Sequence, residues 1–229
     1  MDFNRVRLYQ ELEHEEVPGQ EQQLSEPTTF NPINAYFISI EKHIIAYIKN
    51  ATYIVGCLAW LTNMNILDTL KMKAGVKIIV NKEAYLNPEL DVYHNTFHEI
   101  VRTKYNELPD LTAKANLDIT PIFKIASHEN KTGAILTFGV VSSMSKMHHK
   151  FLVFFDQAMK PIGVWTGSYN FSRTSNLSLE NGIYITDPAT IEKYHHEFSK
   201  IYFHAEPYNW KSGILSKAIY GVEDLLKVT

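Results

Sequence analysis

A short segment in the second half of the chain contains residue types suited to phosphoryl chemistry. His148 and Lys150 stand two residues apart, at the start of the apolar run 151–155. Because residues i and i+2 of a β-strand project from the same face, the imidazole and the ammonium are expected side by side. An imidazole can act as nucleophile or as acid near neutral pH, and an ammonium can hold phosphate oxygens. The pair therefore indicates a site for a negatively charged phosphodiester.

A second segment adds hydrogen-bonding groups. Gly167-Ser168-Tyr169-Asn170 follows a short apolar run, and Glu180-Asn181 comes soon after it. A Gly-Ser-x-Asn turn supplies small donors that can reach a phosphate, and a carboxylate can orient an imidazole. We expect both segments to meet at one site.

The two segments resemble motifs of the phospholipase D superfamily, the HKD phosphodiesterases. The likeness consists of His148-x-Lys150 with a following Asp, then Gly167-Ser168-x-Asn170 and Glu180-Asn181, and it extends from about residue 34 to about residue 210. The phrases Met-His-His-Lys-Phe, Trp-Thr-Gly-Ser-x-Asn-Phe and Leu-Glu-Asn are similar to the bacterial nuclease-type branch. One feature departs from the family pattern, because Asp156 stands one residue further from Lys150 than is usual. On a strand this shift moves Asp156 to the other face unless a bulge absorbs it.

The resemblance implies a mechanism in which neither a metal ion nor another cofactor takes part. Family members with two motifs bring both into one site, and members with one motif form a dimer; this chain has a single motif. We therefore expect a homodimer in which His148 of one subunit is the nucleophile and the partner subunit's His148 is the acid. Lys150 would hold the non-bridging oxygens, Ser168 and Asn170 would donate to the phosphate, and Glu180 would accept the second ring N–H of an imidazole.

Further residues near these motifs are candidates for lesser roles. Asp156, Ser172 and Asn181 are possible supporting residues. Trp165 and Tyr169 flank the turn and are candidates for stacking on a nucleic-acid base. A position in the core beneath the site is an equal alternative for Trp165.

Other histidines and lysines are expected to be structural or exposed. His149 should point away from His148, since adjacent strand residues face opposite sides. Histidines of the late helical segment and lysines between the early strands are expected at solvated surfaces: His195, His196, His204, Lys71, Lys73, Lys77 and Lys82.

Hydrophobic periodicity predicts a single α/β domain with a mixed β-sheet flanked by helices on both faces. The resemblance implies that this domain is phospholipase D-like. Helices are expected from Asn31-Pro32 to residue 50, over 65–73 and 93–105, and from Asp187-Pro188 onward. A last helix follows Pro207. Strands are expected over 53–58, 76–81, 119–125, 135–141, 151–155, 162–166 and 182–186. The spacing of the first two strands favours a parallel pair, and 151–155 and 162–166 should form a hairpin.

The charge distribution sets residues 1–30 apart from the rest of the chain. Residues 1–30 carry seven acidic and two basic residues and form a polar acidic arm, a possible contact for a protein partner. Subtracting this −5 from the whole-chain −3 leaves +2 for the rest, a mildly basic body. The catalytic domain is expected over 31–210, and residues 211–229 would pack on the domain or on the dimer. Cys57 is the single cysteine, which excludes an intrachain disulfide and a cysteine-rich zinc site.

The family resemblance implies a metal-independent endonuclease that hydrolyses DNA or RNA through a phosphohistidine intermediate. A phospholipid phosphodiesterase with the same chemistry is one alternative, and a non-catalytic phosphate-binding or scaffold module is another. No apolar run approaches the ~20 residues needed to span a bilayer, and the start of the chain lacks a signal-peptide core. We therefore expect a soluble cytoplasmic protein that does not insert into membranes.

Overall fold

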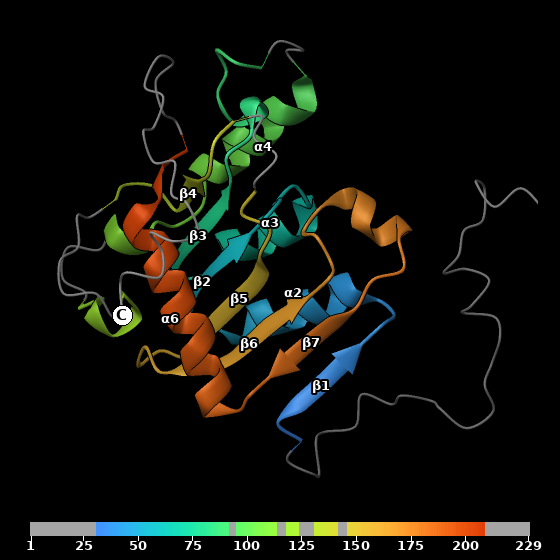
Figure 1. Ribbon diagram of the computed structural model, residues 1–229, viewed down its shortest axis with the longest axis vertical. Coiled ribbons are helices and arrows are strands. Elements are labelled where there is room, and N and C mark those ends of the chain that lie inside the picture. The colour runs from blue at the N-terminus through green and yellow to red at the C-terminus, as the bar shows by residue number, and fades with distance from the viewer. Residues whose placement is uncertain (1–30, 92–94, 114–117, 124–130, 142–145, 209–229) are drawn as a thin grey trace, which may run out of the picture.

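A computed structural model describes residues 31–91, 95–113, 118–123, 131–141 and 146–208. The described residues form one eight-stranded mixed sheet with helices on both faces (Figure 1). This architecture confirms the α/β fold expected from the sequence. The acidic arm and the last helix lie outside the described residues.

The sheet contains both parallel and antiparallel neighbours. Its order is β1-β7-β6-β5-β2-β3-β4-β8. Strands β2, β3 and β4 are parallel to one another, and the other neighbouring pairs are antiparallel. The strands are β1 (Ile33–Tyr36), β2 (Tyr53–Leu58), β3 (Gly75–Asn81), β4 (Ile135–Phe138), β5 (Lys150–Phe155), β6 (Pro161–Gly167), β7 (Gly182–Ile185) and β8 (Glu206–Pro207). The parallel β2–β3 pair and the β5–β6 hairpin confirm two predictions from the sequence.

Helices cover both faces because the central strands are apolar on both sides. On one face, α2 (Ile40–Asn50), α3 (Met64–Lys71) and α4 (Thr96–Asn106) bury their apolar sides. On the other, α6 (Pro188–His204) lies across the sheet with the short α5 (Thr120–Phe123), as Figure 1 shows for α6. The sheet therefore has two hydrophobic cores, a first core under α2, α3 and α4 and a second core under α6 and α5. Alternate side chains of β2 and β5 point into the first core and into the second.

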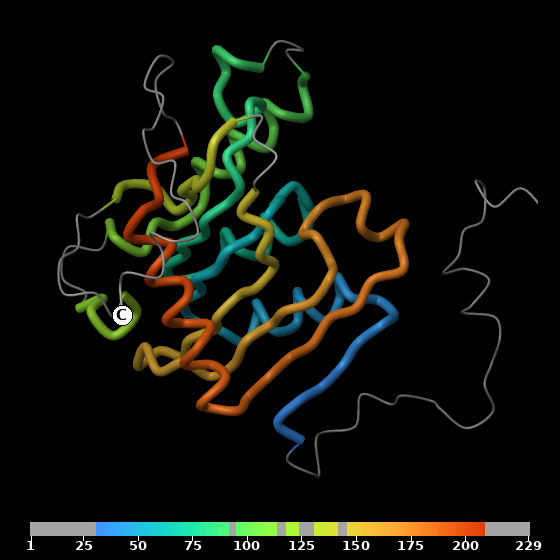
Figure 2. The backbone as a smooth tube through the Cα atoms, in the orientation of Figure 1, coloured from blue at the N-terminus to red at the C-terminus, as the bar shows by residue number. Residues whose placement is uncertain are grey.

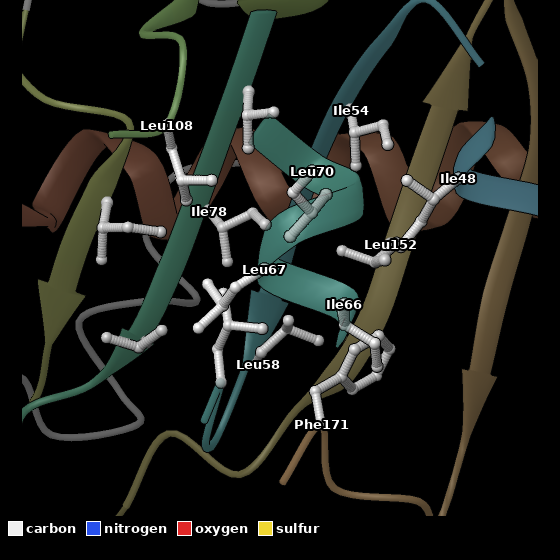
Figure 3. Close-up of a cluster of buried hydrophobic side chains, with 14 of the residues drawn as sticks. Ile48, Ile54, Leu58, Ile66, Leu67, Leu70, Ile78, Leu108, Leu152 and Phe171 are labelled. Carbon is white, nitrogen blue, oxygen red and sulfur yellow. The ribbon is translucent and has the colours of Figure 1, made fainter. Parts of the chain in front are cut away.

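The first core lies beneath α3, close to the candidate site. Leu58, Leu152 and Phe171 are fully buried there, together with Ile66 and Leu67 of α3 (Figure 3). Burial of each such side chain stabilises the fold by about 1.5–3 kcal/mol. The loop containing Phe171 is therefore fastened to the core by hydrophobic contact.

Two predicted elements were wrong. Residues 33–36 form a strand instead of the start of a helix, and α2 begins only at Ile40. Pairing of β1 with β7 overrides the helical spacing, and Ser39 takes a left-handed φ of 51° between the two elements. Residues 120–123 are helical instead of extended, because Ile122 and Phe123 pack into the core under α6. In both places long-range packing decides between two readings of a short apolar pattern.

Lys77, Lys82 and His195 are buried, contrary to the expectation of a solvated surface. The Lys77 side chain is fully buried in β3, where its ammonium donates to Asp110 at 2.5 Å and to Thr112 at 2.9 Å. Burial lowers the pKa of Lys77, although the Asp110 carboxylate opposes that shift. His195 is fully buried against α5, where its Nε2 contacts the Ile122 carbonyl oxygen.

Removal of Asp110 should destabilise the fold strongly. We expect Asp110→Ala to lower the free energy of unfolding by about 3–5 kcal/mol, because it leaves a buried ammonium without its carboxylate. Asp68→Ala is the matched control: Asp68 pairs with Lys104 but is 53% exposed, and such a pair contributes about 0–1 kcal/mol. Urea unfolding measures both. Equal effects would contradict a structural role for the Lys77–Asp110 pair.

Candidate functional site

His148 lies immediately before β5 and is positioned by the neighbouring strands. Lys150 pairs with Leu58 of β2, and the Ala59 N–H donates to the His149 carbonyl oxygen at 2.7 Å. On the next strand, the buried Asn81 accepts the Met147 N–H at 3.1 Å. The backbone on both sides of His148 is therefore held by hydrogen bonds.

The side chains of His148 and Lys150 meet as their spacing predicts. The Lys150 Nζ atom lies 3.1 Å from His148 Nδ1 and 3.3 Å from Nε2, and it donates to the His148 carbonyl oxygen at 3.0 Å. Partial burial, together with the charges of Lys150, Lys146 and His149, lowers the pKa of His148. The electrostatics therefore favour the neutral imidazole, which is the form able to attack phosphorus.

His149 points to the opposite side of the sheet. Its Nε2 lies 3.4 Å from Glu197 of α6, and its ring packs edge-on against Phe151. This placement agrees with the expectation that His149 and His148 face apart.

The turn after β6 forms the second side of the site. The Ser168 N–H donates to the Asn181 carbonyl oxygen at 3.1 Å, and the Asn181 N–H donates to Ser168 Oγ at 3.0 Å. The preceding Gly167 has a φ of 153°, and a Cβ there would lie 2.2 Å from the Asn181 carbonyl oxygen. The glycine of the motif is therefore required by close backbone approach. Figure 2 shows the loop that this turn opens, running from the end of β6 to the start of β7.

The pairing of β5 with β6 places the Ser168–Asn170 turn beside His148 and Lys150. Phe151 pairs with Thr166 across β5 and β6, so Lys150 falls opposite Gly167 when the register continues by one residue. Glu180 accepts the hydroxyl of Ser168. Burial lowers the pKa of Lys150, and the charge of Glu180 opposes this shift. A bond from Glu180 to an imidazole stays a prediction.

Asn170 and Ser172 differ in their surroundings. The Asn170 Oδ1 atom is buried and, within the described ranges, has no hydrogen-bond partner. Such groups are rare in folded proteins and call for an explanation, of which a role in a site is one. Ser172 Oγ contacts Thr174 and Ser175 hydroxyls at 3.2 and 2.9 Å. Ser172 thus takes part in the loop's internal bonds.

The carboxylate of Glu41 on α2 supports the Ser168–Asn170 turn through Asn176. Glu41 accepts amide hydrogens from Asn63 at 2.8 Å, from Asn65 at 2.7 Å and from Asn176. Asn176 in turn accepts the Tyr169 hydroxyl at 2.7 Å. Burial acts to raise the pKa of Glu41, but these three bonds outweigh it and lower the pKa.

A backbone contact secures the same turn. The Phe171 carbonyl oxygen accepts the N–H groups of Thr62 and Asn63 at 2.8 and 3.0 Å. The segment after β2 and the segment after β6 are therefore joined by side chains and by backbone.

Trp165 takes the core position expected as an alternative, whereas Tyr169 is not exposed for stacking and Asp156 lies away from Lys150. Trp165 is fully buried, stacked on Tyr36 at 5.5 Å and packed over Gly182, so its ring offers no face to a base. Tyr169 is only 2% exposed and is bound to Asn176. Asp156 lies at the far end of β5 from Lys150, where its carboxylate accepts the Lys160 N–H at 2.9 Å and closes the β5–β6 turn. The extra residue between Lys150 and Asp156 therefore affects the β5–β6 turn and not the candidate site.

Sequence reasoning missed three residues that the structure brings to the site: Trp60, Asn81 and Glu41. The indole of Trp60 packs edge-on to the His148 imidazole, with ring centroids 5.3 Å apart. No signal in the sequence pointed to Trp60, because only the fold pairs 53–58 with 150–155 and so places residue 60 across from residue 148. None pointed to Glu41 and Asn81 either, since their partners are distant in sequence.

The described segments contain no group of three or more His, Cys, Asp or Glu side chains able to hold a metal ion. They also contain no helix long and apolar enough to cross a bilayer.

Comparisons with known proteins agree with the family resemblance and the fold. The family model described as cardiolipin synthase, PLD-like domain, matches residues 44–202. The chain therefore belongs to the phospholipase D superfamily. It is 48% identical over 196 residues to uncharacterized protein L381 of Acanthamoeba polyphaga mimivirus, with 81% of this chain and 70% of that protein covered.

A solved structure shares the architecture. NucT from Helicobacter pylori matches with a TM-score of 0.52 and 14% identity, over 76% of this chain and 98% of that one. Nuc from Salmonella typhimurium, a phospholipase D family member, matches with a TM-score of 0.48 and 14% identity, over 78% and 98%. At this identity the NucT match shows a common fold.

We expect Glu41→Ala to loosen the Ser168–Asn170 turn without unfolding the domain. Loss of a carboxylate that accepts three amide bonds should lower the free energy of unfolding by about 1.5–3 kcal/mol. Because the pKa of Glu41 is depressed, this stabilisation is present above the ordinary carboxyl pKa and disappears as pH falls through the folded-state value. Hydrogen exchange should accelerate in residues 169–178 and stay unchanged in α6.

Glu99→Ala, at an exposed position of α4, is the matched control. Uniform acceleration across the sheet in Glu41→Ala, or none near residue 170, would contradict the supporting role of Glu41.

Proposed function

We propose that this protein is a metal-independent phosphodiesterase that cleaves DNA or RNA internally, in a site shared by two subunits. The observation that supports this most directly is the contact of the Lys150 ammonium with the His148 imidazole at 3.1 Å, beside the Ser168–Glu180 pair. In the proposed site His148 is the nucleophile, Lys150 is the cation, and the neighbouring Ser168–Glu180 pair supplies a hydroxyl and a carboxylate.

The proposed reaction proceeds in two displacements. The neutral His148 imidazole attacks phosphorus, a bond forms between nitrogen and phosphorus, and the bond to the leaving oxygen breaks. The partner subunit's His148 gives its proton to that oxygen. Water, deprotonated by the same partner imidazole, then attacks the phosphohistidine and releases His148. Lys150 from each subunit holds the non-bridging oxygens throughout.

A second subunit is needed because one imidazole cannot be nucleophile and acid on opposite sides of the phosphorus. Exposed apolar side chains support such a contact: Phe37 is 64%, Leu177 79% and Leu179 58% exposed. Phe37 lines a cavity together with Ser178 and Glu180, so Phe37 lies at the border of the candidate site, and Leu177 and Leu179 flank Ser178 in the sequence. A symmetric dimer would cover them.

A phospholipid is the alternative substrate, and one observation favours it. The matching family model is described as that of a cardiolipin synthase. The resemblance of the Trp-Thr-Gly-Ser-x-Asn-Phe and Leu-Glu-Asn phrases to the nuclease-type branch, and the mildly basic body, favour nucleic acid.

Cleavage assays distinguish these substrates. Labelled single- and double-stranded DNA and RNA should be cut in excess chelator, and His148→Ala should lose at least ~10²–10⁴-fold in turnover. His149→Ala is the matched control, since His149 faces α6, and it should retain activity. Turnover of phosphatidylcholine or cardiolipin alone would support the lipid alternative. Cleavage that depends on added metal, or no cleavage of any of these substrates, would contradict the proposal.

Subunit mixing tests the shared site. When His148→Ala and wild-type chains are mixed and allowed to exchange, activity should fall with the square of the wild-type fraction, because each site requires two intact imidazoles. A linear fall would mean that each chain acts alone. Mass measurement in solution should give a dimer, and a monomer that cleaves would exclude the shared site.

A further inference from the structure

Trp60 stands beside the proposed nucleophile and does not serve the core. The Ala59 N–H bonds to His149, which continues the β2–β5 register and leaves Trp60 opposite His148. The two rings lie 5.3 Å apart at 84°. Trp60 is only half-buried, whereas its neighbours Ala59 and Leu61 are 1% and 0% exposed. The indole belongs to neither apolar cluster.

A cation lies next to this indole. The Lys146 Nζ atom is 5.5 Å from the centroid of the Trp60 ring, and it is 3.4 Å from Glu83. The Lys146 side chain is 41% exposed, so neither interaction fixes it strongly. An exposed cation–π contact contributes about 0.5–1 kcal/mol, and an exposed ion pair contributes about 0–1 kcal/mol.

A nucleic-acid base would compete well for the same aromatic surface. Base stacking on an aromatic side chain contributes about 1–3 kcal/mol, more than the contact with Lys146 that it would displace. The released ammonium would remain near the substrate backbone, where it can neutralise a phosphate. A lipid headgroup has no aromatic face to offer.

We propose that Trp60 and Lys146 form the subsite for the nucleotide that flanks the scissile phosphodiester. The base stacks on the indole while its phosphate lies at His148, and Lys146 contacts the neighbouring phosphate. A base can reach the indole only when it is unstacked from its own strand neighbours, so the subsite selects single-stranded nucleic acid. This inference rests on the proposed nuclease function and specifies its substrate.

The test compares labelled single-stranded oligonucleotides with and without one abasic position, scanned along the strand near the cleavage site. For the wild type, loss of the flanking base should lower kcat/KM by ~5–150-fold, which corresponds to the stacking energy of one base. Trp60→Ala should lower kcat/KM on the intact strand by a similar factor and should be insensitive to the abasic position. Trp60→Phe, which keeps an aromatic face, should recover much of the difference, whereas Trp60→Leu should not.

Lys146→Ala has a separate readout. The dependence of log affinity on log salt concentration should become shallower by ~0.7 for a single strand, the value for one lost phosphate contact. Lys160→Ala, in the turn at the far end of β5, should leave the slope unchanged.

The outcomes separate this inference from the nuclease proposal. If the wild type cleaves oligonucleotides but Trp60→Ala lowers kcat/KM equally on intact and abasic strands, the indole only orients His148 and the subsite is wrong. An abasic position without effect on the wild type overturns the subsite without requiring any variant to fold. A wild type that cleaves phospholipid vesicles and no nucleic acid overturns both proposals.

Discussion

The arrangement of this site depends on the antiparallel pairing of β5 with both β2 and β6. Each pairing fixes a register, and register determines which residues lie across from His148 and Lys150. A slip of one residue on either side would turn the imidazole and the ammonium toward α6 and bring His149 to the site face. The apolar residues of β5 prevent this, because Leu152 and Phe154 fit one core while Phe151, Val153 and Phe155 fit the other.

The candidate site lies where the apolar sheet ends and polar side chains begin. Lys150 is the first residue of β5, and Gly167 is the last residue of β6. Partial burial at this boundary lowers the pKa values of both His148 and Lys150 without removing either group from contact with a substrate. A deeper position would demand a permanent partner, as Lys77 has in Asp110.

The loop between β6 and β7 contributes Ser168, Asn170 and Glu180, and loops are held less firmly than strands. Here its start is fixed by Phe171 in the core and by the bonds of Glu41 and Asn176. Hydrophobic contact sets the position of the loop, and the amide bonds set the orientation of its turn. Such support holds the candidate site residues of a loop in a fixed position.

Local pattern alone determined a large part of this protein. The spacing of His148 and Lys150 before the apolar run predicted that both side chains lie on one face of a strand. The helices and strands with long periodic patterns were also predictable, because periodicity reflects burial directly. Short segments were not predictable from their own pattern. Residues 33–36 form a strand because they pair with β7, and residues 120–123 form a helix whose Ile122 and Phe123 pack in the core under α6.

Only the tertiary structure decided which distant side chains meet. Trp165 and Tyr169 are adjacent to the motif in sequence and yet are buried, while Trp60 and Glu41 are far away in sequence and contact its residues or their supports. The physical reason is that the order of strands in a sheet arises from the packing of the whole chain. A sequence shows which face of its own strand a side chain occupies. Which strands become neighbours depends on the burial of apolar side chains in both cores at once.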